Sequence, residues 1–314
     1  MNQRLLSMLT SMLTSMPNQP ALLLLALSAT PAASLMAQKT DSTAVCSSCA
    51  TWNEPQPPFR VFGNTYYVGP HGLGAILITS DSGHVLIDGA LDESVPNILA
   101  SIRALGFRIE DVKLILNSHV HSDHAGGIAE LQRLSGARVA ASPWSAGVLK
   151  SGGVGRDDPQ YGILLPIAPV ANVSVIGDNE TLHVGPIAVT SHFTPGHTPG
   201  GTSWTWKSCE AGRCLYIAYA DSQSPISADN FLFTNNTSYP NVIQDFQHSA
   251  DVLSTLPCDI LLSPHPGAVS LWDRLAKRDA GDTNALVDPS ACRTYAKNAR
   301  VAFAKRIATE KIGK

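Results

Sequence analysis

Four side chains that can bind transition metals lie close together in this chain: His119, His121, Asp123 and His124. The whole sequence of 314 residues contains only ten histidines, so this is a strong local concentration. Imidazole nitrogens and carboxylate oxygens are ligands that zinc takes in proteins. A polar loop whose histidines merely face water is the alternative, but three histidines and an aspartate at these offsets argue against it. The run therefore predicts metal-dependent chemistry.

The run lies where a strand passes into a helix. Residues 111–116 are an apolar stretch typical of a buried strand, and residues 126–133 are typical of a helix. In an extended backbone, side chains at positions i and i+2 leave on the same side, so His119 and His121 can reach one ion. The turn into the helix then directs the other two ligands toward a second point nearby.

Two ions need more ligands than one loop supplies, and two further histidines lie in similar settings. His197 follows the strand-like residues 187–193 in a turn rich in Pro and Gly, and His265 follows the strand-like residues 259–262 between two prolines. A proline-bracketed turn without a metal is the alternative for His265. Among the other histidines, His71 stands in a loop between two strand-like segments. The others are expected to be surface or core residues.

These motifs resemble the metallo-β-lactamase superfamily, and most closely its subclass B3. The resemblance rests on the His-x-His-x-Asp-His run, on His197 in Pro-Gly-His-Thr and on the late Pro-His-Pro. The subclass is indicated by Gly-Gly-Thr-Ser-Trp-Thr-Trp at residues 200–206 and by Ala-Tyr-Ala-Asp-Ser at residues 218–222. The similarity runs from about Phe59 through the C-terminal helix. It implies an α/β fold of the αββα type, with two facing mixed sheets and helices on the outer faces.

The resemblance also implies two zinc ions per chain. The ligands that it assigns are, for the first ion, His119, His121 and His197 and, for the second ion, Asp123, His124 and His265. It implies that a metal-bound hydroxide hydrolyses the β-lactam ring of carbapenems, cephalosporins and penicillins without an acyl-enzyme, conferring antibiotic resistance. The resemblance also implies that Asp123 is the catalytic residue, because it would help to orient the attacking hydroxide.

Residues around the metals receive roles from the same resemblance. Ser222 would face the second zinc and Ser224 would bind the substrate carboxylate, although a loop that caps its own backbone explains both serines as well. Gln160 would reach the substrate from a loop above the site, or it is an ordinary polar loop residue. Asp88 is expected to support the ligand loops from behind. Asp221 is expected to be structural and not to bridge the metals.

Two other functions remain open. A hydrolase of the same fold that acts on lactones, thioesters or phosphoesters would use Asp221 as a bridging ligand. A periplasmic zinc-binding protein without catalysis would need a filled coordination sphere, whereas six ligands over two ions leave positions open.

The N-terminus is typical of an exported protein. Residues 1–37 contain a short apolar core at residues 21–27 followed by small residues, which predicts a cleaved signal peptide and a periplasmic location. Cleavage near Ala33 is the alternative to cleavage after residue 37. Residues 38–58 would then form an N-terminal extension, and residues 59–314 the metallo-β-lactamase domain.

All six cysteines are expected to be oxidised in an exported chain. Cys209 and Cys214 flank a turn between two strand-like segments, so a disulfide across a hairpin is expected. The resemblance implies a second disulfide between Cys258 and Cys292. The remaining two cysteines, which could form a local bridge or stay as free thiols, are Cys46 and Cys49.

Composition limits the class of partner. A hydrophobic content of 44% and 24 glycines suit a globular α/β chain, and the net charge of −3 comes without a basic run. Neither nucleic acid nor an anionic membrane surface is an expected partner, and we expect a monomer that acts on a small molecule. Strand-like segments gather in two halves, residues 59–142 and residues 167–266. Helix-like segments interleave at 92–105, 127–134, 239–256 and the C-terminus.

Overall fold

The computed structural model describes residues 46–312, so the expectations for the signal peptide and its cleavage site lie outside the described residues. The strands are β1 (Phe59–Phe62), β2 (Thr65–Tyr67), β3 (Ile76–Ile78), β4 (His84–Ile87), β5 (Val112–Leu116), β6 (Arg138–Ala141), β7 (Val173–Val175), β8 (Thr181–Val184), β9 (Ile187–Phe193), β10 (Thr202–Glu210), β11 (Arg213–Tyr219) and β12 (Ile260–Leu262). The α-helices are α1 (Cys49–Trp52), α2 (Val95–Ala104), α3 (Ser122–Ala125), α4 (Ile128–Ser135), α5 (Pro143–Ser151), α6 (Val242–Thr255), α7 (Leu271–Asp279) and α8 (Ala291–Ile312). Short 3-10 helices are η1 (Asp92–Ser94), η2 (Ile109–Asp111) and η3 (Pro266–Val269).

The strands form two mixed sheets. The first has the order β1-β2-β3-β4-β5-β6-β7, antiparallel up to β4 and parallel from β4 onward. The second has the order β12-β11-β10-β9-β8, and only its β11–β12 pair is parallel.

The two predicted strand-rich halves of the sequence do not coincide with the two sheets. β7 lies in the second half, yet it pairs with β6 of the first sheet, Val139 opposite Val173. The physical reason is the helix α5 between them: a strand, a crossover helix and a parallel strand form one unit on one sheet. The first sheet therefore takes its last strand from the second strand-rich half.

Side chains alternate between two apolar layers along the first sheet. Leu77 and Leu86 pack with the buried residues of helices α2, α4 and α5. Their neighbours Ile76 and Ile87 point the other way and pack against Trp204 and other residues of the second sheet. This alternation is the period-two pattern of a strand that is buried on both faces.

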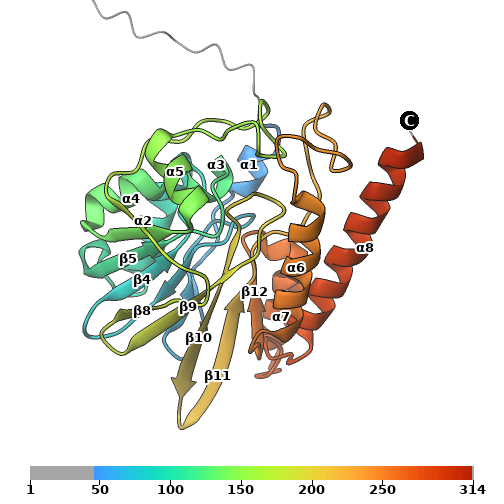
Figure 1. The fold of residues 1–314 in the computed structure, drawn as a ribbon. Helices are drawn as coiled ribbons and strands as arrows, with labels where there is room; N and C mark the ends of the chain where they lie inside the picture. Colours follow the sequence, from blue (N-terminus) through green and yellow to red (C-terminus); the bar gives the residue numbers. More distant parts are fainter. Residues whose placement is uncertain (1–45, 313–314) are drawn as a thin grey trace, which may run out of the picture. The chain divides into compact units, whose positions relative to one another are not determined.

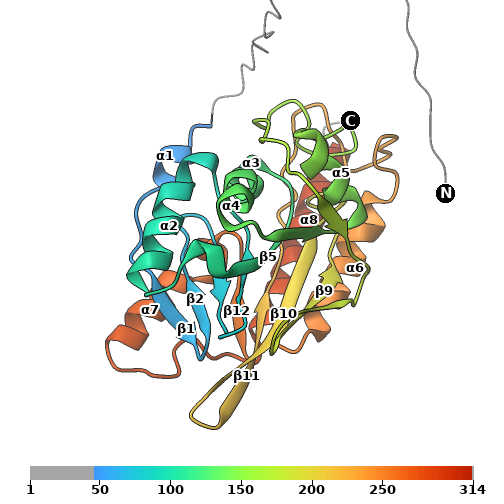
Figure 2. The ribbon, with the colours of Figure 1, turned by 90° about the vertical axis from the view of Figure 1, so that its left-hand side faces the viewer.

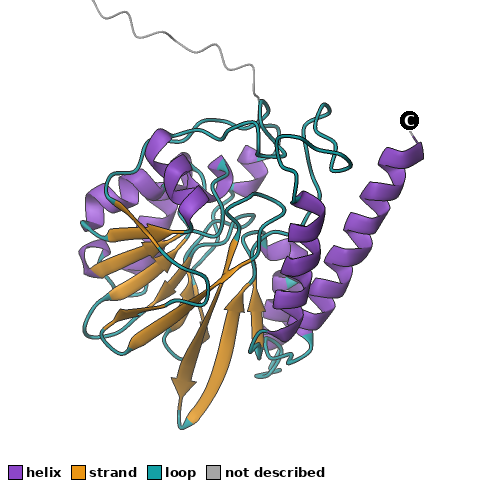
Figure 3. Cartoon of the chain, in the orientation of Figure 1, coloured by secondary structure: helices purple, strands orange, loops and turns teal. Residues whose placement is uncertain are grey.

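Helices also cover the outer face of the second sheet. Ala218 of β11 and Leu261 of β12 pack with Leu253 of α6 and Ala296 of α8. Figures 1 and 2 show α2, α4 and α5 on one side of the strands and α6 and α8 on the other, and Figure 3 shows the same layers by secondary structure. The predicted αββα arrangement is confirmed.

Disulfides join elements as expected. Cys209–Cys214 links the paired strands β10 and β11, and Cys258–Cys292 ties the segment before β12 to α8. Of the two alternatives for the remaining cysteines, the structure has the local bridge, Cys46–Cys49.

The segment before β1 lies against the body of the protein. The Gly72 amide donates to the Trp52 carbonyl (2.9 Å), and the Ser94 hydroxyl donates to Asn53 Oδ1 (2.6 Å). None of the helices between residues 46 and 312 combines the length and apolarity needed to cross a membrane.

Candidate metal centre

The six predicted ligands come from chain segments that leave the two sheets at one edge. His119 and His121 follow β5, His197 follows β9, and His265 follows β12 directly before η3. The other two ligands, Asp123 and His124, lie on the short helix α3. Strand ends at one edge of an α/β sandwich are a usual location for a site, because the loops there can vary while the strands hold them in place.

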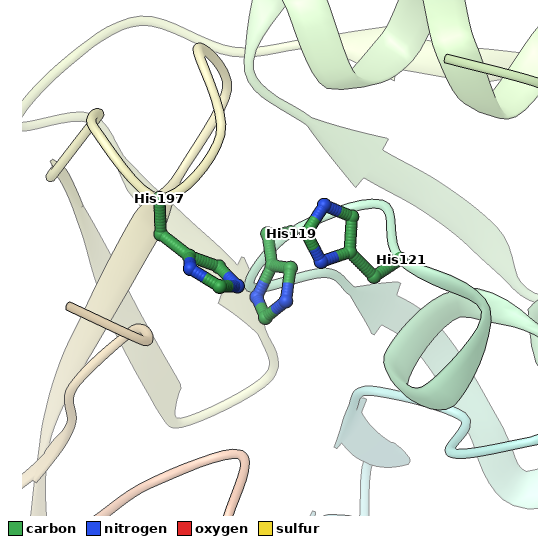
Figure 4. Close-up of side chains that lie close together, drawn as sticks. All are labelled: His119, His121 and His197. Atoms are coloured by element: carbon green, nitrogen blue, oxygen red, sulfur yellow. The ribbon is translucent and has the colours of Figure 1, made fainter. Parts of the chain in front are cut away.

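The first group consists of His119, His121 and His197. Their rings converge on one point in Figure 4, with ring centroids 4.7 to 4.9 Å apart. One ring nitrogen from each lies within 4.8 Å of the others, and all three side chains are buried. Three imidazoles around one point are the protein ligands of many catalytic zinc sites, which leave a fourth position for water or substrate.

The second group consists of Asp123, His124 and His265. His124 Nε2 lies 3.2 Å from both Asp123 Oδ2 and His265 Nε2, and His265 Nε2 lies 3.4 Å from the same carboxylate oxygen. Ligand atoms of a tetrahedral site with bonds of about 2.0 Å lie about 3.3 Å apart. The three atoms therefore already have the spacing that a zinc ion requires.

Each histidine of the first group uses its other nitrogen for a hydrogen bond. His119 Nδ1 donates to Asp221 Oδ1 (2.7 Å), and His197 Nδ1 donates to the Ser224 carbonyl (2.8 Å). His121 instead donates from Nε2 to the Asp158 carboxylate (3.2 Å). His119 Nε2 is left buried with no partner among the described residues. An unpaired buried nitrogen is costly, so its presence at this point fits a metal.

Burial and contacts within the ligand groups favour the metal-binding forms of His119, His197 and Asp123. Burial lowers the pKa of His119 well below its usual value and that of His197 to about 3. Burial opposes ionisation of Asp123, but His124 and His265 outweigh it and hold its pKa well below its usual value. Neutral imidazole and ionised carboxylate are the forms that bind metal, so few protons need to be displaced at neutral pH.

Asp88 supports the ligand loop, as expected. Its carboxylate accepts hydrogen bonds from the Ser118 amide (2.7 Å), the Ser118 hydroxyl (2.6 Å) and the Tyr219 hydroxyl (2.8 Å). Burial raises the pKa of Asp88 to about 7 against these hydrogen bonds. Because Tyr219 belongs to β11 and Asp88 follows β4, this carboxylate links the two sheets directly behind His119.

A pocket of about 430 Å³ opens over both groups. The predicted substrate residues Gln160, Ser222 and Ser224 all line it. Gln160 Nε2 lies 3.4 Å from His121 Nδ1, so the side-chain amide of Gln160 reaches the open side of the first group. Trp52 also lines the pocket, with its ring centroid 5.2 Å from that of His265.

Some expectations are refined by the structure. His71 lies away from both groups: its ring stacks on Trp272 at 4.4 Å, and Nδ1 lies 3.1 Å from Gln56 Oε1. Asp221 belongs to neither ligand group, but its carboxylate holds the His119 ring. Asp221 is therefore a structural residue that orients a candidate metal ligand.

Sequence reasoning missed Asp158 and Trp52. Asp158 stands beside Asp157 in a polar loop, and nothing in the sequence distinguishes the two carboxylates. Trp52 lies in the segment before the first strand, where no motif points to the site. Only the tertiary contacts with His121 and His265 identify them.

Three comparisons bear on the family. A model of the family described as "Metallo-beta-lactamase superfamily" matches residues 69–273. The solved structure of the Rm3 metallo-β-lactamase is 56% identical with a TM-score of 0.84, and the match covers 85% of this chain and 99% of that one. MEM-A1, a subclass B3 metallo-β-lactamase from a soil metagenome library, is 51% identical with a TM-score of 0.82, covering 84% of this chain and 100% of that one.

Curated sequences give weaker matches. The N-acyl homoserine lactonase AttM of Agrobacterium fabrum (strain C58) is 29% identical over 161 residues, which are 41% of this chain and 57% of the lactonase. The similarity to subclass B3 is higher in identity and spans nearly the whole of the solved chains. The chain therefore belongs to the metallo-β-lactamase superfamily and, within it, to the subclass B3 metallo-β-lactamases.

Proposed function

We propose that this protein is a β-lactamase that uses two zinc ions per chain to hydrolyse carbapenems, cephalosporins and penicillins. One observation carries the proposal: both ligand groups are complete in a chain that is more than half identical to solved B3 enzymes over nearly their whole length. When bound in such a site, zinc lowers the pKa of a coordinated water to about 7 and polarises a carbonyl group.

The chain's own residues position the reactants. His119, His121 and His197 would hold the first ion, and the group around Asp123 would hold the second. Asp123 presents Oδ2 to both histidines of its group, which leaves Oδ1 to accept a hydrogen bond from the attacking water. This gives Asp123 its catalytic role, because the oxygen of that water is then oriented toward the lactam carbonyl.

Polar residues of the pocket would bind the substrate. The pocket wall contains no lysine or arginine among residues 46–312, so the substrate carboxylate would be bound by neutral donors. The Ser224 and Ser222 hydroxyls and the Gln160 amide can supply them. None of these residues needs to act as a nucleophile, so no acyl-enzyme is expected.

The position of Asp221 favours a lactam over a lactone or thioester as substrate. The alternative hydrolase is expected to use this aspartate as a bridging ligand, whereas here Oδ1 accepts a hydrogen bond from His119 Nδ1. The match to the lactonase is also limited to 57% of its length.

Hydrolysis of nitrocefin and imipenem by the purified protein tests this function. We expect two zinc ions per chain by elemental analysis, loss of turnover on chelation and recovery on adding zinc. His197→Ala should abolish turnover, and His248→Ala, which changes an exposed histidine on α6, should not. Mass spectra during turnover should contain no protein adduct. Turnover of lactones or thioesters without lactam hydrolysis would contradict the proposal.

We also propose that the chain is exported to the periplasm and confers resistance there. Three disulfides among the described residues support an oxidising compartment. Expression of the full-length gene should raise the carbapenem concentration that a susceptible bacterial host survives. Deletion of codons 2–37 should leave the protein in the cytoplasm and remove this protection, and protection that persists from the cytoplasm would contradict export.

A further inference from the structure

Asp158 is a buried carboxylate that touches both a candidate metal ligand and the loop above the site. It lies between α5 and β7, in residues 152–172, and it is completely buried. Its Oδ2 and Oδ1 lie 3.2 and 3.3 Å from His121 Nε2. Oδ1 also accepts a hydrogen bond from the backbone amide of Gln160 (2.8 Å). One carboxylate therefore holds the His121 ring and the backbone of its own loop together.

The same loop forms one wall of the pocket. Ile163, Leu164 and Leu165 line the pocket together with Gln160. The Pro159 carbonyl accepts a hydrogen bond from the Ala228 amide (2.9 Å), which connects this wall to the segment that follows Ser224. The position of the wall therefore depends on contacts made next to Asp158.

The contact with Asp158 also determines which nitrogen of His121 can bind a metal. Because Nε2 donates to the carboxylate, Nδ1 is the nitrogen that remains for a metal. His119 and His197 do the opposite: their Nδ1 atoms donate to oxygens, which leaves Nε2 for a metal. In the second group the Nε2 atoms of His124 and His265 converge. His121 is thus the one ligand histidine whose geometry requires its proton on Nε2.

We propose that Asp158 is a positioning residue that links the first metal site to the pocket wall. It fixes the His121 ring through Nε2 and the loop through the backbone amide of Gln160. The inference rests on the metal binding in the proposed function and not on the substrate. Removal of a carboxylate that holds the second nitrogen of a metal-bound histidine typically lowers metal affinity by about 10- to 100-fold. Linkage further requires that metal binding and order in the loop affect each other.

Variants at two neighbouring aspartates test the proposal. Asp158→Ala removes both hydrogen bonds, and Asp158→Asn keeps an acceptor without its charge. Asp157→Asn is the matched control, because Asp157 Oδ2 accepts a hydrogen bond from Trp144 Nε1 (2.6 Å) and not from a candidate ligand. In competition with a chromophoric chelator, D158A should bind its first zinc about 10- to 100-fold more weakly. D158N should show a smaller loss, and D157N should bind as the wild type does.

Spectra of ¹⁵N-histidine-labelled, zinc-loaded protein separate positioning from general stability. We expect an Nε2–H signal from His121 in wild type and D157N, and its loss or faster exchange with solvent in D158A. Zinc should slow hydrogen exchange of the backbone amide of Gln160 in wild type and not in D158A. Wild-type zinc affinity together with an intact Nε2–H signal in D158A would overturn the proposal. If D158A does not fold, the same two measurements on D158N decide. No β-lactam enters these measurements, so a failure of the proposed function would be seen separately.

Discussion

Asp221→Asn should weaken zinc binding and stabilise the metal-free protein at the same time. Asp221 Oδ1 lies 2.7 Å from His119 Nδ1, both side chains are completely buried, and Oδ2 has no hydrogen-bond partner among the described residues. Burial raises the pKa of Asp221 well above its usual value, and the nearby Asp88 raises it further. The carboxylate is therefore unfavourable in the metal-free protein and useful next to a cation.

The size of the effect on zinc follows from the bond to His119. An ionised acceptor makes the imidazole a better ligand, and loss of such a partner typically costs about 10- to 100-fold in metal affinity. This corresponds to about 1.4 to 2.8 kcal/mol. Asparagine preserves the size of the side chain and one acceptor oxygen, so the loss should come from the charge.

The effect on the metal-free protein should depend on pH. A carboxyl group whose pKa is raised by folding stabilises the fold below its unfolded pKa of about 3.9, and that contribution is lost as the pH rises. Asparagine does not titrate in this range. The stability of the variant relative to wild type should therefore increase between pH 4 and pH 8.

Two measurements check this prediction. Urea unfolding of the chelated proteins at pH 4, 6 and 8 gives the difference in stability, and chelator competition gives the zinc affinity. Asp81→Asn, at an exposed position in the turn between β3 and β4, is the control and should change neither. Unchanged zinc affinity, or a metal-free variant less stable than wild type at pH 8, would refute this account of Asp221.

Three further predictions concern stability. Because folding lowers the pKa of His197 to about 3, protonation of this histidine in the unfolded state lowers the stability of the metal-free protein as the pH falls below about 6.5. In urea unfolding, the free energy of unfolding of His197→Gln relative to wild type should therefore rise by about 2 kcal/mol between pH 7.5 and pH 5. Glu310→Ala leaves the backbone amides of Phe233 and Thr234 without their acceptor, so it should lower the free energy of unfolding in urea by about 2 to 4 kcal/mol. A loss near zero would show that these hydrogen bonds from the loop to α8 do not stabilise the fold. Replacing Cys258 and Cys292 by Ala opens a bridge of sequence separation 34, whereas Cys209–Cys214 spans 5, so by loop entropy the first pair should lower stability by about 4 kcal/mol and the second by about 2, and the reverse order would contradict this reasoning.

The positions of the candidate ligands could be predicted because their signals are local. His119 and His121 follow a buried strand at a spacing of two, and Pro or Gly fixes the turns around His197 and His265. Each of these features depends on a few consecutive residues. The motifs at residues 200–206 and 218–222 indicated the subclass and, through it, the fold, and the comparison with solved B3 enzymes confirmed both.

The residues behind the ligands could not be predicted with the same precision, because their roles depend on contacts between distant segments. Asp158 reaches His121 over 37 positions, and Asp221 reaches His119 over 102. The pairing of β7 with β6 likewise depends on where the crossover through α5 places the chain. Local patterns contain no information that separates Asp158 from Asp157, since both are aspartates in one polar loop.

Electrostatics explains why these buried carboxylates occur together. Asp88, Asp158 and Asp221 are completely buried, and Asp123 lies beside them in the second ligand group. Among residues 46–312 no lysine or arginine forms an ion pair with any of the four. Burial raises the pKa of Asp88 to about 7 and that of Asp221 well above its usual value, and it lowers the pKa of His119, His124 and His197. Ionised Asp88 and Asp221 therefore lack a positive partner in the metal-free protein. Divalent cations bound by the two groups would supply the missing positive charge. It follows that zinc should stabilise the fold as well as support catalysis, and that removing any one of these carboxylates should reduce the stabilisation by zinc more than it reduces the stability of the metal-free chain.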